Sequence, residues 1–370
     1  MTGGSAGPRR DVAPDLLRAL AILLVMSWHI PKAGLPPVMI TIRQFGWLGV
    51  DIFFVLSGFL IGSEIFRQLG DGGRVDLKVF YAKRILRIWP AFLVILAVYL
   101  LWPNLRESPH LMPVWRLLTF TANFGLDYRI TGAFTHVWSL CVEEQFYLAL
   151  PLMALALHKF RSPWATALLV AAIVIAGMVW RAYLWQHWHA TGGDTADVLR
   201  VLYYPSYTRL DGLLMGVLLA AATTFRHAAW QRFAPAWATA SSALGCLLIC
   251  GYWALADGIT LSPISAPLFY PLFAFGMALL LSTLLRIEPR LQWLRWSGAG
   301  FIAGISYSLY LSHKLVMHAV KVAAPIAWRD GWTGVALHYG ASIAVATLLF
   351  IMVERPVLAL RPLILRRLAR

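Results

Sequence analysis

The sequence predicts an all-α integral membrane protein with about ten transmembrane helices in a single domain, residues 1–370. Hydrophobic residues make up 59% of the 370-residue chain and charged residues only 13%, about half the charged share of an ordinary soluble domain. Apolar runs of roughly 20 residues, the length an α-helix needs to cross a bilayer, recur along the chain. No polar stretch is long enough for a soluble domain, so we expect none to be appended.

Each predicted span is an apolar run bounded by polar or helix-breaking residues. We place the spans at 15–34, 46–67, 84–103, 137–157, 164–188, 205–224, 234–256, 265–285, 299–320 and 334–357. They leave a short N-terminal segment, 1–14, and a basic C-terminal tail, 358–370. The glycine-rich second span is either a helix that packs closely on a neighbour or a broken helix beside a substrate cavity. We expect a loop with a short interfacial helix at 110–130.

The charge distribution predicts the orientation. Ten spans place both termini on one side, and roughly two thirds of the 32 lysines and arginines fall on that side. The positive-inside rule therefore predicts cytoplasmic termini. The net charge of +15 is explained by topology and by attraction to anionic lipid headgroups, so we expect no nucleic-acid partner. The three cysteines show no metal-ligand spacing, and we expect no metal site.

The first span, in the stretch DLLRALAILLVMSWHI, carries Arg18 and His29. Eleven residues of helix place the two side chains on one face, about 16 Å apart along the axis. An ionisable residue within a span is costly and is by default a functional candidate. The alternative is that Arg18 reaches the headgroups and that His29 makes a structural hydrogen bond.

Basic residues gather at the predicted cytoplasmic end of the third span. The stretch FYAKRILRIWPAF contains Lys83, Arg84 and Arg87, and the two arginines share a helix face at i, i+3. Arginine binds phosphate groups bidentately. We therefore predict a phosphate-binding fork that Arg18 joins at the same depth, with ordinary positive-inside placement as the alternative.

Carboxylates lie in the predicted outer half. The fourth span begins THVWSLCVEEQFYLALP and carries His136, Glu143 and Glu144, while Asp51 lies near the outer end of the second span. Adjacent glutamates point about 100° apart on a helix, so only one of the pair can face a given point. The structural alternative is a buried ion pair.

Other polar residues occur in the later spans. Arg209 and Asp211 begin the sixth span in RLDGLLMG, and His313 lies in the outer half of the ninth. Together with His136 these are candidate substrate-binding residues. The alternatives are an internal ion pair for Arg209 and Asp211 and a structural role for His313. Glu354, in VERP at the end of the tenth span, is expected to pair with a basic neighbour.

These stretches together resemble the acyltransferase-3 family of bacterial membrane O-acyltransferases. The matching features come in family order and cover nearly the whole chain: Arg18-x10-His29, GVDIFFVLSGFLIG, Arg84-x-x-Arg87, HVWSLCVEEQFYLALP, RLDGLLMG, SYSLYLSH and VERP. The first family motif often reads Asp-Gly-Leu-Arg, whereas this chain has DLLR. The family's fixed glutamate aligns with Glu143, which favours Glu143 over Glu144.

The resemblance implies a membrane-bound O-acyltransferase of the bacterial cytoplasmic (inner) membrane. Such an enzyme moves an acyl group, commonly acetyl from acetyl-CoA, to a hydroxyl group. Typical acceptors are sugars of lipopolysaccharide, exopolysaccharide, peptidoglycan or glycolipid precursors, and succinyl or longer acyl groups are alternatives to acetyl. The expected partners are the lipid bilayer, acyl-CoA, a carbohydrate or lipid-linked glycan acceptor, and glycan-assembly proteins.

A mechanism follows as a hypothesis. The four basic residues named above would hold the donor's phosphates, and the pantetheine arm would extend along the first span to His29. His29 either acts as general base on the acceptor hydroxyl, oriented by Glu143 or Asp51, or carries the acyl group itself. Glu144 is the alternative to Glu143. A transporter without covalent chemistry is the competing class, but we find no convincing internal repeat of the kind that many transporters contain.

Overall fold

The computed structural model describes residues 11–72, 74–160, 163–228, 230–231, 240–241, 243–245, 247–248, 263–325 and 328–368. Its principal helices are α1 Val12–His29, α2 Pro37–Gln44, α3 Leu48–Gly72, α4 Leu77–Leu101, α5 Val114–Leu118, α6 Trp138–Phe160, α7 Pro163–Ala190, α8 Thr195–Val198, α9 Asp211–Phe225, α11 Ser265–Arg286, α12 Ala299–Ala323, α13 Gly331–Leu349 and α14 Arg355–Leu368. The described residues form no β-strand and only one isolated bridge, between Leu111 and Ala133.

Seven described helices are long and apolar enough to cross a membrane. They are α1, α3, α4, α6, α7, α11 and the continuous helix from Gly331 to Leu368. Each overlaps one of the predicted spans, and the predicted all-α membrane fold is confirmed. The chain is a multi-pass membrane protein.

The number of spans stays a prediction. The predicted span 205–224 corresponds to α9, which is apolar but has only 15 residues. The predicted span 299–320 corresponds to α12, which has 25 residues but is not among the seven apolar helices. The predicted span 234–256 falls largely outside the described residues.

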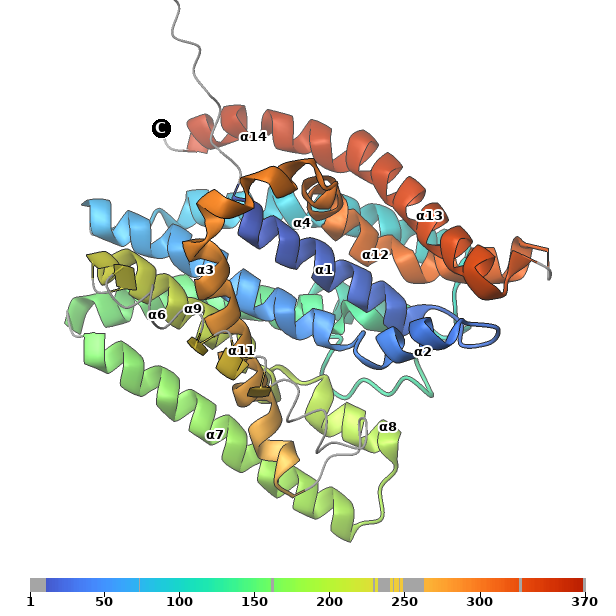
Figure 1. The fold of residues 1–370 in the computed structure, drawn as a ribbon, viewed down its shortest axis with the longest axis horizontal. Coiled ribbons are helices and arrows are strands. Elements are labelled where there is room, and N and C mark those ends of the chain that lie inside the picture. Colours follow the sequence, from blue (N-terminus) through green and yellow to red (C-terminus); the bar gives the residue numbers. More distant parts are fainter. Residues whose placement is uncertain are drawn as a thin grey trace, which may run out of the picture.

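Helix α1 lies in the middle of the bundle, between α3 and α12 (Figure 1). Its N-terminus is held by Glu288, whose two carboxylate oxygens accept hydrogen bonds from the Val12 and Ala13 backbone N–H groups at 2.6 and 2.8 Å. This distant carboxylate satisfies donors that a helix start leaves unpaired. Figure 1 shows α7 along one edge of the bundle and α14 along the opposite edge.

The glycine-rich second span is a continuous helix, so the broken-helix alternative is wrong. Helix α3 extends without interruption from Leu48 to Gly72, and its glycines allow α9 to pack against it. A Cβ atom at Gly58 would lie 2.0 Å from the Leu213 carbonyl oxygen, and one at Gly216 would lie 2.2 Å from that of Val55. The glycines of VLSGFLIG and RLDGLLMG therefore meet in one close helix contact, as small residues do in membrane bundles.

The segment predicted as a loop with a short helix has that form: Val114 and Trp115 of the helix are exposed, while other parts of the segment pack into the bundle. It contains the short helix α5, and the Phe120 ring that follows it packs on Trp89 and Phe92 in the middle of α4, with ring centroids 5.6 and 5.1 Å apart. The fully buried amide of Asn123 donates to Ser206 at 2.9 Å and accepts from Gln145 at 3.0 Å. Irregular backbone is tolerated at membrane depth when protein covers it in this way.

The predicted C-terminal tail is helical as far as it is described, to Leu368. A π-helical turn at Phe350–Glu354, followed by Pro356, joins α13 to α14, and Figure 1 shows the two helices as a bent arch. Such a turn and a proline are common causes of bends. The 38-residue helix measures about 57 Å, whereas the hydrocarbon core is about 30 Å thick. Its last part, α14, therefore packs on α4 at the bundle's edge.

Candidate active site

Two pockets lie inside the bundle, and Tyr310 of α12 lines both. The arginine pocket has a volume of about 700 Å³ and lies toward the end of the bundle at which α1 begins. The aromatic pocket has a volume of about 100 Å³ and lies toward the end at which α1 finishes at His29. Tyr310 donates a hydrogen bond to the His136 carbonyl oxygen and lies 2.7 Å from the Ser139 hydroxyl. The Tyr310 ring thus forms part of the wall between the pockets.

Five arginines from three helices line the arginine pocket. Helix α1 supplies one, α4 supplies two and α14 supplies two: Arg18, Arg84, Arg87, Arg355 and Arg361. The pocket brings together three of the four basic residues that the sequence predicted for phosphate binding. Like charges repel at this range unless carboxylates or an anionic ligand offset them.

Glu64 of α3 offsets part of that charge. Its carboxylate accepts a hydrogen bond from Arg84 at 2.7 Å and another from Lys83 at 2.6 Å. Lys83, the fourth predicted residue, pairs with Glu64 but is not among the residues that line the pocket.

Two more carboxylates hold the remaining predicted arginines. Glu354 pairs with Arg87 at 2.9 Å and also accepts from the Ser308 hydroxyl, so the predicted basic partner of VERP is confirmed. Arg18 pairs with Asp15, one turn earlier in α1, at 3.4 Å. The pocket keeps an excess of positive charge, since Arg355 and Arg361 also line it.

Glu143 and Glu144 have separate environments, as the angle between adjacent helix positions requires. Glu143 lines the arginine pocket, accepts from the Tyr147 hydroxyl at 2.7 Å and is hydrogen-bonded to Ser57. Glu144 is not part of that lining, and one of its carboxylate oxygens is buried without a partner among the described residues.

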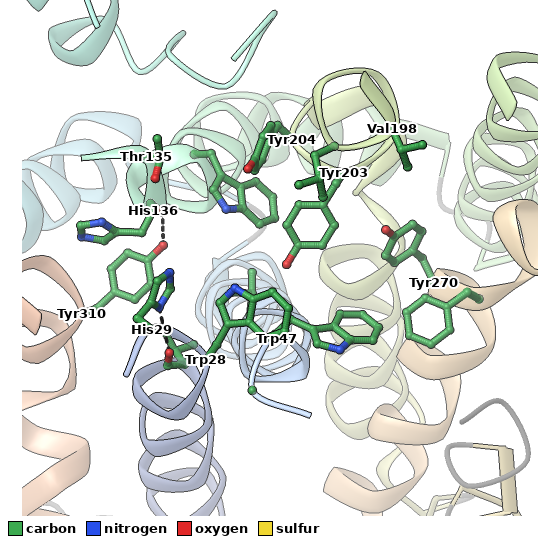
Figure 2. A pocket seen from close by; sticks show the side chains of 16 residues that line it. Trp28, His29, Trp47, Thr135, His136, Val198, Tyr203, Tyr204, Tyr270 and Tyr310 are labelled. Carbon is green, nitrogen blue, oxygen red and sulfur yellow. Dashed lines mark hydrogen bonds between the residues drawn. The ribbon is translucent and has the colours of Figure 1, made fainter. Parts of the chain in front are cut away.

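Aromatic side chains form most of the second pocket, as Figure 2 shows. Its aromatic residues are Trp28, Trp47, Trp138, Tyr203, Tyr204, Phe269, Tyr270 and Tyr310, beside His29 and His136. The hydroxyl groups of Tyr203, Tyr204 and Tyr270 have no hydrogen bond to another described residue. The pocket therefore combines apolar ring faces with unused polar groups.

His29 is surrounded by histidines rather than carboxylates. Its Nδ1 atom lies 2.9 Å from the Val25 carbonyl oxygen and 3.2 Å from Nε2 of His313. The ring centroids of His313 and His136 lie 4.9 and 6.3 Å from that of His29. Among the described residues, no group of His, Cys, Asp or Glu side chains could hold a metal ion.

The acidic partners predicted for His29 bond elsewhere. Asp51 forms a buried ion pair with Arg209 at 2.9 Å, and Glu143 bonds to Tyr147 as described above. Asp211 pairs with Arg181 at 2.8 Å, so the predicted pairing of Arg209 with Asp211 is replaced by two pairs.

Arg209 also supports the aromatic pocket from behind. Its guanidinium carbon lies 3.9 Å from the Tyr270 ring centroid and 4.7 Å from that of Tyr203, a cation–π arrangement. Neither Arg209 nor Asp211 lines the pocket itself.

The rim beside the histidines is held by a buried ion pair. Glu107, in the loop after α4, bonds to Lys314 of α12 at 2.8 Å, and Lys314 also donates to the Thr135 hydroxyl at 2.8 Å. Burial raises the pKa of Glu107, but Lys314 and a hydrogen bond from Tyr99 outweigh burial and hold that pKa below its ordinary value. The pair connects the loop after α4 to the helix that carries His313.

The sequence did not predict several lining residues. Arg355 and Arg361 were assigned to the end of the last span and to the tail, and only the bend between α13 and α14 brings them to the pocket. Trp47 and Tyr310 gave no signal beyond their position in apolar runs. The stretch SYSLYLSH contains Tyr310 three residues before His313, and this helical spacing could have indicated a shared face.

Comparison with known proteins places the chain in a family. A family model described as an acyltransferase domain matches residues 11–353. Peptidoglycan O-acetyltransferase OatA of Listeria monocytogenes is 27% identical over 93% of this chain and 55% of its own length. A Staphylococcus aureus protein named putative O-acetyltransferase is 31% identical over 56% of this chain and 34% of its own length.

A third relative is named putative peptidoglycan O-acetyltransferase YrhL, from Bacillus subtilis, and is 29% identical over 56% of this chain and 32% of its own length. The chain thus spans about a third to a half of the length of these relatives. No solved structure matches. The acyltransferase model covers most of the chain, and residues 18–356 of the chain carry the family's motifs in order. The chain therefore belongs to the acyltransferase-3 family.

Proposed function

We propose that this protein is a membrane O-acyltransferase that moves an acetyl group from acetyl-CoA to a hydroxyl of a carbohydrate acceptor. The observation that carries the proposal is the pair of unlike pockets that meet at Tyr310. One is cationic and suits a phosphorylated donor. The other is aromatic, contains His29, and suits a sugar ring.

The arginine pocket supplies the donor site. Acyl-CoA carries its phosphates on the nucleotide part, and arginine recognises phosphate oxygens through paired N–H groups. Arg84 and Arg361 approach this site from α4 and α14, and Arg18 from α1. By the charge distribution of the sequence, this end of the bundle faces the cytoplasm, where acyl-CoA is made.

The acyl group must then pass Tyr310 to reach His29. About 16 Å of helix separate Arg18 from His29, which is on the scale of a pantetheine arm. That arm would lie in the arginine pocket along α1, and its thioester would approach the wall between the pockets. The acceptor would enter the aromatic pocket from the other end of the bundle.

The chemistry requires an unprotonated imidazole nitrogen on His29. As general base, His29 takes the proton of the acceptor hydroxyl while the oxygen of that hydroxyl bonds to the thioester carbonyl carbon. The C–S bond then breaks, and the CoA thiolate leaves. In the alternative, His29 first takes the acyl group and then passes it to the acceptor. Both routes use the same nitrogen.

The aromatic pocket favours a carbohydrate acceptor. The C–H faces of a sugar ring pack on tryptophan and tyrosine rings, while its hydroxyls can bond to the hydroxyls of Tyr203, Tyr204 and Tyr270. Two of the relatives above are named for peptidoglycan. We therefore take a peptidoglycan or lipid-linked saccharide precursor as the first acceptor to test.

The experiment uses purified protein in liposomes with labelled acetyl-CoA and separate acceptors: peptidoglycan fragments, lipid-linked saccharides and lipopolysaccharide. We expect label to appear as an O-acetyl ester on one class, and to depend on His29. Movement of an acceptor across the membrane without any covalent product would contradict the proposal and indicate a transporter.

A further inference from the structure

We propose that His313 is a positioning residue for His29. Its Nε2 atom accepts a hydrogen bond from Nδ1–H of His29 and so keeps Nε2 of His29 unprotonated and available to the aromatic pocket. The inference rests on the proposed function above and adds a residue that the predicted mechanism did not include. The tautomer of each of the two rings follows from its neighbours, because several neighbouring atoms can only accept hydrogen bonds.

The backbone of α12 determines the tautomer of His313. Its Nδ1 atom lies 2.7 Å from the Tyr310 carbonyl oxygen and 3.2 Å from that of Leu309. A carbonyl oxygen can only accept, so Nδ1 carries the hydrogen. A neutral imidazole has one N–H group, and Nε2 of His313 is therefore an acceptor.

The tautomer of His29 follows from its two neighbours. Its Nδ1 atom faces the Val25 carbonyl oxygen at 2.9 Å and Nε2 of His313 at 3.2 Å. Both are acceptors, so Nδ1 of His29 carries the hydrogen and Nε2 has the lone pair. Nε2 of His29 has no partner among the described residues, and the His29 ring lines the aromatic pocket.

The Val25 carbonyl alone is a poor anchor for the ring. It lies one turn earlier in α1, where it also accepts the backbone N–H of the helix, so the ring only shares it. His313 comes from another helix and contacts the ring from the side, with an angle of 60° between the ring planes. Two acceptors from different helices limit rotation of the His29 ring and stabilise its N–H when it takes a proton.

A neutral partner suits this depth in the membrane. In hydrolase triads a carboxylate performs this task, but an anion at a fully buried site needs strong compensating contacts. His313 has 0% of its surface exposed, and Asp51 and Glu143 are engaged elsewhere. The next residue of α12, Lys314, is paired with Glu107 at 2.8 Å, so the neighbouring carboxylate is engaged as well.

The test compares His313→Gln with His313→Asn. The two side chains carry the same amide group, but only glutamine extends far enough to place an oxygen where Nε2 of His313 lies. We expect His313→Gln to keep within about threefold of the wild-type kcat. For His313→Asn we expect a fall of about 10- to 100-fold, a part of what general-base catalysis supplies. The KM values for donor and acceptor should change little in either variant.

Three outcomes overturn the proposal. They are equal kcat values for the two variants at equal membrane abundance, an asparagine variant as fast as wild type, or a loss that appears mainly in KM. As a cross-check, His313→Asn should cost nothing further in a His29→Ala background, because its effect acts through His29. Failure of the proposed function is distinguishable, since then the wild-type protein transfers no acyl group or His29→Ala has the wild-type rate.

Discussion

The arginine pocket and the aromatic pocket keep polar groups at membrane depth by different means. In the first, four of the five arginines are half-buried, Arg355 is exposed, and they share a few carboxylates, so positive charge remains. In the second, the titratable groups are histidines held by carbonyl oxygens and by each other. The Lys314–Glu107 ion pair lies at the rim of this pocket, and the Arg209–Asp51 pair lies behind its aromatic rings. The cationic pocket can attract an anion, whereas the aromatic one excludes charge and presents neutral hydrogen-bonding groups.

Under the proposed function, the two pockets have separate tasks. A change in the arginine pocket should alter donor affinity, and a change at His29 should alter the chemical step. A change elsewhere in the aromatic pocket should alter acceptor affinity. Kinetic constants separate these effects, because KM for each substrate and kcat respond to different interactions.

The largest expected effect is that of His29→Ala. Removal of the general base or acyl carrier should lower kcat by about 100-fold or more, while the binding of acetyl-CoA stays near the wild-type value. Product formation in liposomes and donor binding by calorimetry measure the two quantities. A correctly inserted variant with the wild-type rate would remove His29 from the mechanism.

The next effect is expected for Arg84→Ala and Arg361→Ala. Each removes a cationic contact to phosphate, worth about 1.5–3 kcal/mol, so KM for acetyl-CoA should rise about tenfold or more with little change in the acceptor constant. Arg67→Ala is the matched control, because Arg67 is exposed and, among the described residues, bonds only to the Ser63 carbonyl oxygen. If the control raises KM for acetyl-CoA as much as the two variants do, the pocket does not bind the phosphates.

A smaller effect is expected for Trp47→Leu. The change removes a ring that packs on Phe269 with centroids 5.0 Å apart and, by our proposal, on the acceptor. Since an aromatic contact contributes about 1 kcal/mol, the acceptor KM should rise about fivefold while the donor KM stays constant. A rise in the donor KM alone would mean that the pockets have been assigned the wrong way round.

The smallest effect concerns stability and pH. The depressed pKa of Glu107 means that its pair with Lys314 stabilises the fold above the unfolded-state pKa, and that this stability is lost as the pH falls through the folded-state pKa. Thermal unfolding in detergent, from about pH 7 to about pH 3, should therefore show a steeper loss in wild type than in Glu107→Gln. Asp11→Asn, at an exposed position without a side-chain cap bond, should follow the wild-type curve.

The sequence predicted the long-range order of the site better than its contacts. Arg18, Arg84 and Arg87 line one pocket and His29 another, as helical spacing and depth along the spans indicated. The predicted partners of the carboxylates were wrong, because a position in a helix indicates which face a side chain is on but not which neighbouring residue it contacts. Asp51 pairs with Arg209, which lies just before α9, and Glu143 bonds to Tyr147 on its own helix.

By itself, then, the sequence determined the membrane fold, most helix positions and the separation of basic and titratable residues by depth, since these depend on local apolar length and on the helical repeat. Only the tertiary structure decided the rest. It packed part of the segment after α4 into the bundle, bent the last helix so that Arg355 and Arg361 reach the arginine pocket, and placed His313 beside His29. Those outcomes depend on which helices pack together, and residues far apart in the chain, such as Gly58 and Gly216, control that packing.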